Sequence, residues 1–389
     1  MERNVPKLRF KGFSDEWKKA KFKELLNVID GDRGVNYPKE DEFTEEGYCL
    51  FLNAKNVTKE GFKFNENKFI SSEKDSILRK GKLERNDIVL TTRGTVGNRA
   101  IFTTDIKYDN IRINSGMVLL RANKIEPHYL YSYMKSIQFD KQLKQIMFGS
   151  AQPQLTVKDI NEFKVSLPSI QEQERIANFL TKVDKIIEKQ DEKVKNLEKY
   201  KKGMMQKIFS QEIRFKDENG NEYPEWKELK ISDTLKIKHG KDQKKVECEN
   251  GKYPILGTGG EIGRTNIPIY NKESVLIGRK GTIDRPVYMD TPFWTVDTLF
   301  YSQVFNNYNA KFIYYNFQCI NWKKYCEASG VPSLSAATIE NIKYMIPVLQ
   351  EQIKIANFLS CIDDVLDKEK EKLQEIREWK KGLLQQMFV

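Results

Sequence analysis

The side chains that most often carry out catalysis are scarce in this sequence. It contains two histidines, His128 and His239, and five scattered cysteines without a C-x-x-C pair. A His-relayed nucleophile, a zinc ribbon and a disulfide framework all need more of these residues or a closer spacing. We therefore predict no catalytic residue, no metal site and no cofactor site in this chain, and thiols that are reduced and structural.

A glycine-rich segment at Gly257–Thr265 looks at first like a phosphate-binding loop. Its spacing matches neither G-x-x-x-x-G-K-[ST] nor G-x-G-x-x-G, the arrangements that cradle nucleotide phosphates. We expect a turn or a DNA-facing loop there. The sequence also lacks an Asn/Asp-Pro-Pro-aromatic loop of the kind found in amino-methyltransferases and a nuclease-type acidic cluster with an adjacent lysine. An enzyme is not indicated.

Residues suited to binding nucleic acid are plentiful by contrast. The chain carries 66 Lys+Arg against 55 Asp+Glu, a net charge of +11 that attracts polyanions. Cations on glycine-bearing turns can reach bases or phosphates, while Gln, Ser and Thr supply further hydrogen bonds. A solvated turn or a buried structural contact is the alternative for each residue. The candidate contacts to double-stranded DNA are Arg93, Gly94, Thr95, Asn98, Arg99, Gln152, Gln154, Arg279, Lys280, Thr282, Arg285 and Ser333.

These candidates belong to a chain that repeats itself. Residues 168–209 align without a gap on residues 347–388, at an offset of 179, and 18 of the 42 positions are identical. The same offset pairs Leu155 with Leu334 upstream. A weaker repeat, at an offset of 209, pairs Glu16-Trp17-Lys18 with Glu225-Trp226-Lys227, and Gly31 with Gly240. The chain is therefore two copies of one plan.

The strongly repeated segments have the periodicity of long paired helices. Apolar positions alternate at spacings of four and three from Ile176 to Ile208 and from Ile355 to Met387, which is a heptad pattern. In both segments this line of apolar positions, the seam, is interrupted by polar residues at the same two places, Gln190/Glu369 and Lys201/Lys380. We expect the two helices to pair with each other. Each would be a rod of roughly 58 Å whose length sets the distance between two domains.

The variable segments read as short strands with a few helices. Alternating or continuous apolar runs predict strands at 86–92, 99–103 and 117–120, and their counterparts at 274–278 and 286–289. Helical patches are expected near 129–147 and 311–325. We therefore predict an α+β fold, with two globular domains joined by two long helices. The expected boundaries are 1–167 and 211–346 for the globular domains, and 168–210 and 347–389 for the helices.

No run of apolar residues is long enough for a signal peptide or a membrane span. We therefore expect a soluble, cytoplasmic protein.

Two divergent domains, each followed by P-x-x-Q-E-Q-x-x-I-A-x-F-L, at Pro168–Leu180 and Pro347–Leu359, resemble the specificity subunit of a type I restriction-modification system. The resemblance also includes Ser-x-x-Pro-x-Leu at Ser150–Leu155 and Ser329–Leu334, and it spans essentially the whole chain. It implies two target-recognition domains that each read one half of a split, asymmetric DNA sequence. It also implies that the two helices lie antiparallel as a coiled coil and set the gap between the halves.

The resemblance places catalysis on other chains. Two modification subunits would bind S-adenosylmethionine and methylate adenine N6, and two restriction subunits would use ATP and Mg2+ for translocation and cleavage. Because two identical partners need two equivalent surfaces, the repeated helices are the expected docking sites. The candidate docking residues, expected on exposed faces, are Glu172, Arg175, Asn178, Glu351, Lys354 and Asn357.

Two other functions remain open from the residues alone. One is a self-sufficient DNA methyltransferase with a divergent motif, which would bind S-adenosylmethionine by itself. The other is a coiled-coil interaction scaffold without sequence-specific DNA contact, whose binding to DNA would be weak, salt-sensitive and indifferent to sequence.

Overall fold

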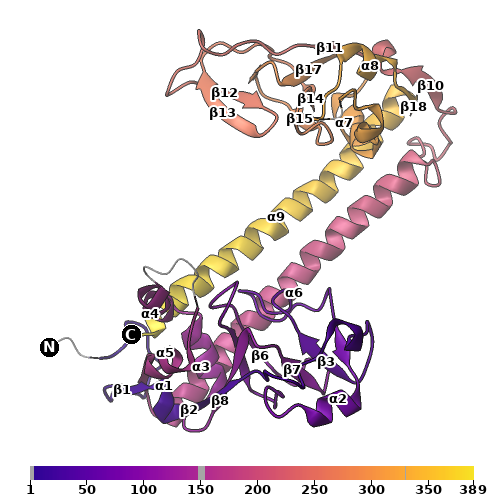
Figure 1. The fold of residues 1–389 in the computed structure, drawn as a ribbon. Helices are drawn as coiled ribbons and strands as arrows, with labels where there is room; N and C mark the ends of the chain where they lie inside the picture. Colours follow the sequence, from indigo (N-terminus) through magenta and orange to yellow (C-terminus); the bar gives the residue numbers. More distant parts are fainter. Residues whose placement is uncertain (1–3, 148–153, 329) are drawn as a thin grey trace. The chain divides into compact units, whose positions relative to one another are not determined.

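The computed structural model describes residues 4–147, 154–328 and 330–389. The chain divides into two compact units, one made of residues 1–190 and 372–389 and the other of residues 191–371 (Figure 1). Each unit combines a globular α+β part with portions of two long helices, α6 (Ile170–Phe209) and α9 (Leu349–Met387). The expected fold class is confirmed. The boundaries expected from the sequence give each long helix a segment of its own. The two compact units instead divide both helices, between residues 190 and 191 in α6 and between residues 371 and 372 in α9.

The strands in the described part of the first unit form three small sheets. The strand orders are β2-β8-β5-β6, β4-β3-β7 and β1-β9, and all neighbours are antiparallel except β3 and β7. Its strands are β1 (Lys18–Lys21), β2 (Leu26–Asp30), β3 (Cys49–Leu52), β4 (Phe69–Ile70), β5 (Ile88–Thr91), β6 (Arg99–Ile101), β7 (Ile111–Ile113), β8 (Met117–Ala122) and β9 (Lys164–Leu167). Its shorter helices are α1 (Phe22–Leu25), α2 (Ser72–Ile77), α3 (Pro127–Met134), α4 (Ile137–Met147) and α5 (Val157–Glu162).

The second unit has the same plan. Its strand orders are β11-β17-β14-β15, β13-β12-β16 and β10-β18, and again one pair, β12 with β16, is parallel. Its strands are β10 (Lys227–Lys230), β11 (Leu235–Lys238), β12 (Tyr253–Gly257), β13 (Gly260–Thr265), β14 (Ser274–Gly278), β15 (Val287–Met289), β16 (Trp294–Thr295), β17 (Leu299–Val304) and β18 (Lys343–Ile346). Its shorter helices are α7 (Ala310–Cys319) and α8 (Ala336–Asn341).

The elements expected from apolar patterning are present in both units. The central strands β5 and β14 each contain a continuous apolar run, Ile88–Leu90 and Val275–Ile277, and all their residues are buried, as in a strand covered on both faces. Each is hydrogen-bonded to two antiparallel neighbours, so it lies in the interior of its sheet. The expected strands and helical patches of both halves are thus confirmed.

The two long helices pack against each other through the predicted seam. Ile176, Leu180 and Val183 of α6 are buried, as are Ile355, Leu359 and Ile362 of α9. Within the first unit Asp184 pairs with Lys380, and within the second Lys201 pairs with Asp363. Lys193 of the second unit also pairs with Glu369, so within this unit the numbers rise along α6 as they fall along α9, and the helices run antiparallel.

The two lysines of the seam are equivalent in the repeat but differ in their surroundings. In the second unit, Asp363 accepts from Lys201 Nζ at 2.5 Å and from the Tyr315 hydroxyl at 2.7 Å. In the first unit, Asp184 contacts two lysines, Lys380 and Lys135, the latter at 3.4 Å. Burial lowers the pKa of both of these lysines, since little solvent remains to stabilise two cations beside one carboxylate.

We expect Lys201→Met to destabilise the second unit by about 2 kcal/mol, because it leaves a largely buried Asp363 without its cation. The equivalent change, Lys380→Met, is expected to cost the first unit less than about 0.5 kcal/mol, because Lys135 still pairs with Asp184 and a buried like-charge repulsion is removed. Hydrogen exchange of α7 and α3 amides measures the two effects separately. Equal losses in the two variants would contradict this account.

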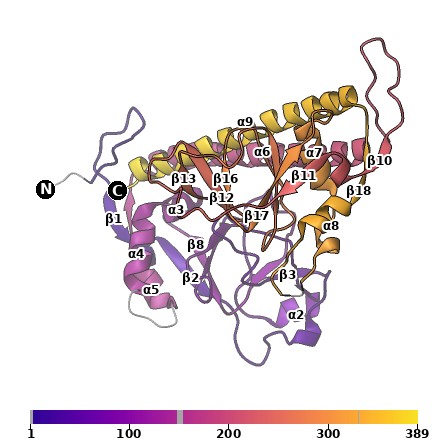
Figure 2. The ribbon, with the colours of Figure 1, turned by 90° about the horizontal axis from the view of Figure 1, so that it is seen from above.

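The start of the chain occupies the place that the linker after α6 occupies in the other unit. The Leu8 amide donates to the Gln386 carbonyl at 2.9 Å, and the Ile213 amide donates to the Lys207 carbonyl at 3.1 Å. Lys207 and Gln386 are equivalent in the helix repeat. The sequence Arg-Phe-Lys follows in both places, at residues 9–11 and 214–216. In the first unit the C-terminus accordingly lies beside β1, as Figures 1 and 2 show.

The repeated glycines, Gly31 and Gly240, lie where two backbone segments approach closely. A β-carbon on Gly31 would lie 2.3 Å from the Asn114 carbonyl oxygen, and one on Gly240 would lie 2.1 Å from that of Val296. No side chain fits at such distances, so both positions require glycine. The weak repeat seen in the sequence is therefore structural.

Candidate nucleic-acid interface

In the first unit, the turn between β5 and β6 carries the candidates from Arg93 to Asn98. Gly94 has φ +70°, a conformation that glycine adopts without strain. The amides of Thr92 and Arg93 both donate to the Gly116 carbonyl, at 2.8 and 3.3 Å. The Leu155 amide donates to the Thr92 carbonyl at 3.0 Å. This last bond brings the end of the predicted Ser-x-x-Pro-x-Leu motif against the turn.

The second unit repeats these three backbone hydrogen bonds. The amides of Arg279 and Lys280 donate to the Thr298 carbonyl at 2.8 and 3.3 Å, and the Leu334 amide donates to the Arg279 carbonyl at 2.9 Å. Gly281 has φ +84°. Its amide donates to the Pro332 carbonyl at 2.8 Å. Arg93-Gly94-Thr95 and Lys280-Gly281-Thr282 are therefore equivalent turns, bonded to the equivalent residues Leu155 and Leu334.

Several candidates share the exposed surface of these turns. Arg93, Gly94, Thr95 and Gln154 are exposed in the first unit. With its amide oxygen turned toward Arg93, Gln154 accepts from Nε and Nη2 of that residue at 3.3 and 3.0 Å. In the second unit Lys280 and Arg285 are exposed, while Thr282 and Ser333 are half-buried. Gln152 lies outside the described residues.

Three other candidates have structural partners within their own unit. The Arg99 guanidinium pairs with Asp140 at 3.2 Å, its side chain is 12% exposed, and burial lowers its pKa. The side-chain amide nitrogen of Asn98 donates to the Val57 carbonyl at 2.9 Å. The Arg279 guanidinium pairs with Asp297. These contacts are of the structural kind that the sequence left open, and the role of the three residues at DNA stays a prediction.

The glycine-rich segment forms the end of the β12–β13 hairpin, beside the basic turn of the second unit. A β-carbon placed on Gly281 would lie 3.7 Å from Thr258 Oγ1. One placed on Gly257 would lie 3.7 Å from Thr298 Oγ1, and Thr298 is the residue that holds the turn. Only Thr258 and Gly259 form the turn expected for this segment, while Gly260–Thr265 is strand β13. The position of the segment against Lys280 depends on contacts between segments distant in the sequence, which spacing does not reveal.

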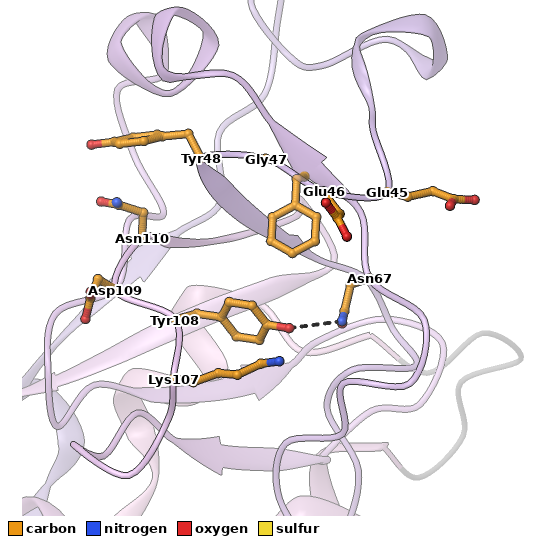
Figure 3. A pocket seen from close by; sticks show the side chains of 10 residues that line it. Glu45, Glu46, Gly47, Tyr48, Asn67, Lys107, Tyr108, Asp109 and Asn110 are labelled. Carbon is orange, nitrogen blue, oxygen red and sulfur yellow. Dashed lines mark hydrogen bonds between the residues drawn. The ribbon is translucent and has the colours of Figure 1, made fainter.

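A pocket in the first unit has a different character. Its volume is about 470 Å³, and it is lined by Glu45, Glu46, Gly47, Tyr48, Asn67, Phe69, Lys107, Tyr108, Asp109 and Asn110. Figure 3 shows the Asn67 amide directed at the Tyr108 hydroxyl, with a donor–acceptor distance of 3.2 Å. Three carboxylates against one lysine would repel a phosphate backbone. The pocket is therefore unsuited to nucleic acid, unlike the basic turns.

The expected exposure of two docking candidates is wrong. Glu172 and Glu351 are fully buried. Glu172 accepts from Arg9 Nε and Nη2 at 2.7 and 2.8 Å. Glu351 accepts from Arg214 Nη2 at 2.8 Å and from the Trp226 indole at 3.2 Å. Each carboxylate raises the pKa of its arginine, through a charge-assisted hydrogen bond.

The neighbouring glutamines are structural as well. Gln173 Oε1 accepts from the Glu126 amide and Gln352 Oε1 from the Asn309 amide, at 3.0 and 2.9 Å. These amides lie at the starts of α3 and α7. The repeated Gln-Glu-Gln thus fixes each long helix to its globular part. Of the docking candidates, Arg175, Asn178 and Asn357 are exposed and Lys354 is half-buried.

The described residues contain no group of three or more His, Cys, Asp or Glu side chains placed to hold a metal ion. Within the same part of the chain, no helix combines the length and the apolar character needed to cross a membrane.

Comparison with known proteins agrees with the duplicated plan. The family model described as "Type I restriction modification DNA specificity domain" matches residues 14–199 and 223–378. The type I restriction enzyme MjaVIII specificity subunit of Methanocaldococcus jannaschii is 22% identical over 427 residues, covering 98% of this chain and 94% of that protein.

Two solved structures share the fold. The S subunit of a type I restriction-modification system from M. genitalium superimposes with a TM-score of 0.67 at 19% identity, covering 99% of both chains. A chain from a study of complex assembly and conformational transition of the type I R-M system gives 0.56 at 16% identity, covering 96% of this chain and 98% of the other. At these identities the likeness concerns the fold.

Proposed function

Because this chain belongs to the type I restriction-modification DNA specificity family and is a specificity subunit of such a system, we propose that it reads a bipartite, asymmetric DNA target. Each globular part reads one half of the target. The two halves are separated by base pairs that are not read. In this proposal the chain directs adenine-N6 methylation and ATP-dependent cleavage by partner subunits and performs neither reaction itself.

The observation that carries this proposal is the pair of equivalent basic turns. Both present an exposed cation beside a glycine of positive φ, a geometry suited to close approach of a DNA backbone. The loop packed against each turn differs between the units, with Gln154 at the position where the second unit has Ser333. Equivalent positioning with different side chains is what two unlike half-sites require.

We propose that two modification subunits dock on the repeated parts of the helices. Arg175, Asn178, Lys354 and Asn357 are the remaining candidates for these contacts, since Glu172 and Glu351 are buried. S-adenosylmethionine belongs to the modification subunits in this proposal, and ATP and Mg2+ to two restriction subunits. Equivalent surfaces in the two units favour two copies of one partner.

Sequencing of N6-methyladenine in DNA tests the proposal. DNA from cells that express this chain together with its modification subunit is compared with DNA from cells that express the modification subunit alone. We expect a methylated split motif that depends on this chain. A complex that assembles and binds S-adenosylmethionine, yet adds no motif, would overturn the proposal in favour of a scaffold without sequence-specific contact.

A further inference from the structure

The β12–β13 hairpin contains an irregularity at its exposed edge. Ile255 pairs with Gly263, but the next residue, Leu256, pairs with Glu261, so Ile262 is left without a partner in the ladder. A β-bulge of this kind redirects the side chain of the extra residue, and bulges are common beside functional sites. Ile262 is 50% exposed. A large apolar side chain is therefore held toward solvent at a defined place.

Gly257 of β12 lies between Ile262 and the residue that holds the basic turn. A β-carbon on Gly257 would lie 3.8 Å from Ile262 Cγ2 and 3.7 Å from Thr298 Oγ1. Thr298 in turn accepts the amides of Arg279 and Lys280 through its carbonyl. Ile262 and Thr298 therefore both lie beside Gly257, and the Lys280 turn is hydrogen-bonded to Thr298. An exposed apolar residue and an exposed cation therefore belong to neighbouring segments of the second unit.

We propose that Ile262 is a base-reading residue of the second unit and contacts the C5-methyl group of one thymine in the major groove; this rests on the proposed function of the chain. The major groove admits a two-stranded ribbon such as β12–β13 (Figure 1). Lys280 beside it meets the phosphates and fixes the ribbon against the duplex. An apolar group against a thymine methyl separates thymine from cytosine, which has hydrogen at that position.

The first unit is built differently at the corresponding place. There β3 and β4, which occupy the positions of β12 and β13 in the sheet order, are both buried and are separated by residues 53–68. The proposed contact therefore belongs to one half-site. A substitution of Ile262 changes only the half that the second unit reads.

The test uses the full chain assembled with its modification subunits and duplexes that carry the motif found by methylation sequencing. Each thymine of the half-site read by the second unit is replaced in turn by deoxyuridine, which removes only the C5-methyl group. We expect one position at which this replacement lowers affinity about fourfold, the effect of one buried methyl group. With Ile262→Ala the same replacement has no effect. Ile267→Ala, at an isoleucine that is 61% exposed near the base of the hairpin, is the matched control and retains the fourfold loss.

The outcomes separate this inference from the function on which it rests. If no motif depends on the chain, the proposed function fails. If the motif exists but deoxyuridine is silent at every position, or if Ile262→Ala weakens binding equally at all positions, the motif-reading function stands and the role of Ile262 is overturned. The deoxyuridine measurement does not depend on the folding of a variant, because the protein is unchanged.

Discussion

Replacing Arg93 and Lys280 together by alanine is expected to lower the affinity of the assembled complex for its DNA target about thirtyfold at 0.15 M salt. The two residues occupy equivalent positions on equivalent turns, and both are exposed. A cation that neutralises one phosphate releases counterions and contributes about 0.9 to the slope of log K against log salt. The slope should therefore become shallower by about 1.8 in the double variant. A salt titration of binding measures both quantities.

The matched control for this experiment is Lys18→Ala combined with Lys227→Ala. These two lysines are also exposed and also equivalent in the repeat, but they lie in β1 and β10 rather than on the turns. The control removes the same charge and is expected to change the slope by less than about 0.3, because charges away from the contact release few ions. If the control and the turn variant lower the slope equally, the turns are not the DNA-facing surface.

Replacing Glu351 by glutamine is expected to destabilise the second unit by about 3 kcal/mol, and Glu172→Gln should cost the first unit a similar amount. Both carboxylates are fully buried and each pairs with an arginine through both of its oxygens. Removing the negative charge leaves a largely buried guanidinium without a counter-ion, which is the costly way to break such a pair. Hydrogen exchange of amides in each unit gives the two free energies separately.

Glu174→Gln serves as the control because Glu174 lies on α6 only two residues from Glu172 and is exposed. It is expected to change stability by less than about 0.5 kcal/mol. A different result would show that Glu172 and Glu351 act in the interface with the modification subunits. In that case the Glu172→Gln or Glu351→Gln variant would lose docking while the stability of its unit stays unchanged. We expect instead that both variants lose stability, and that docking fails only where the unit has unfolded.

The long helices and their pairing were predictable because a heptad repeat is a local signal. The positions from Ile176 to Ile208 face the partner helix wherever the globular parts lie, since helical geometry alone brings them to one side. Strands such as β5 and β14 were predictable for a similar reason. Each contains a short apolar run, Ile88–Leu90 or Val275–Ile277, close to turn-forming residues, a pattern consistent with a buried strand.

The site was only partly predictable. The Arg-Gly-Thr and Lys-Gly-Thr turns are visible in the sequence, but their packing against Leu155 and Leu334 rests on backbone bonds between distant segments. The burial of Glu172 could not be read from its place on the helix. It depends on Arg9, which is 163 residues away, reaching the helix from the start of the chain. Burial of a charge is decided by such partners and leaves no periodic signal.

The central proposal for this protein is that each unit reads its own half of the target. Its most direct test is to exchange residues 14–150 for the corresponding segment of another specificity subunit and to sequence N6-methyladenine in the cells that express the hybrid with its modification subunits. We predict a motif in which one half is new and the other half is unchanged. A hybrid complex that assembles and methylates a motif changed in both halves, or in neither, would contradict the claim.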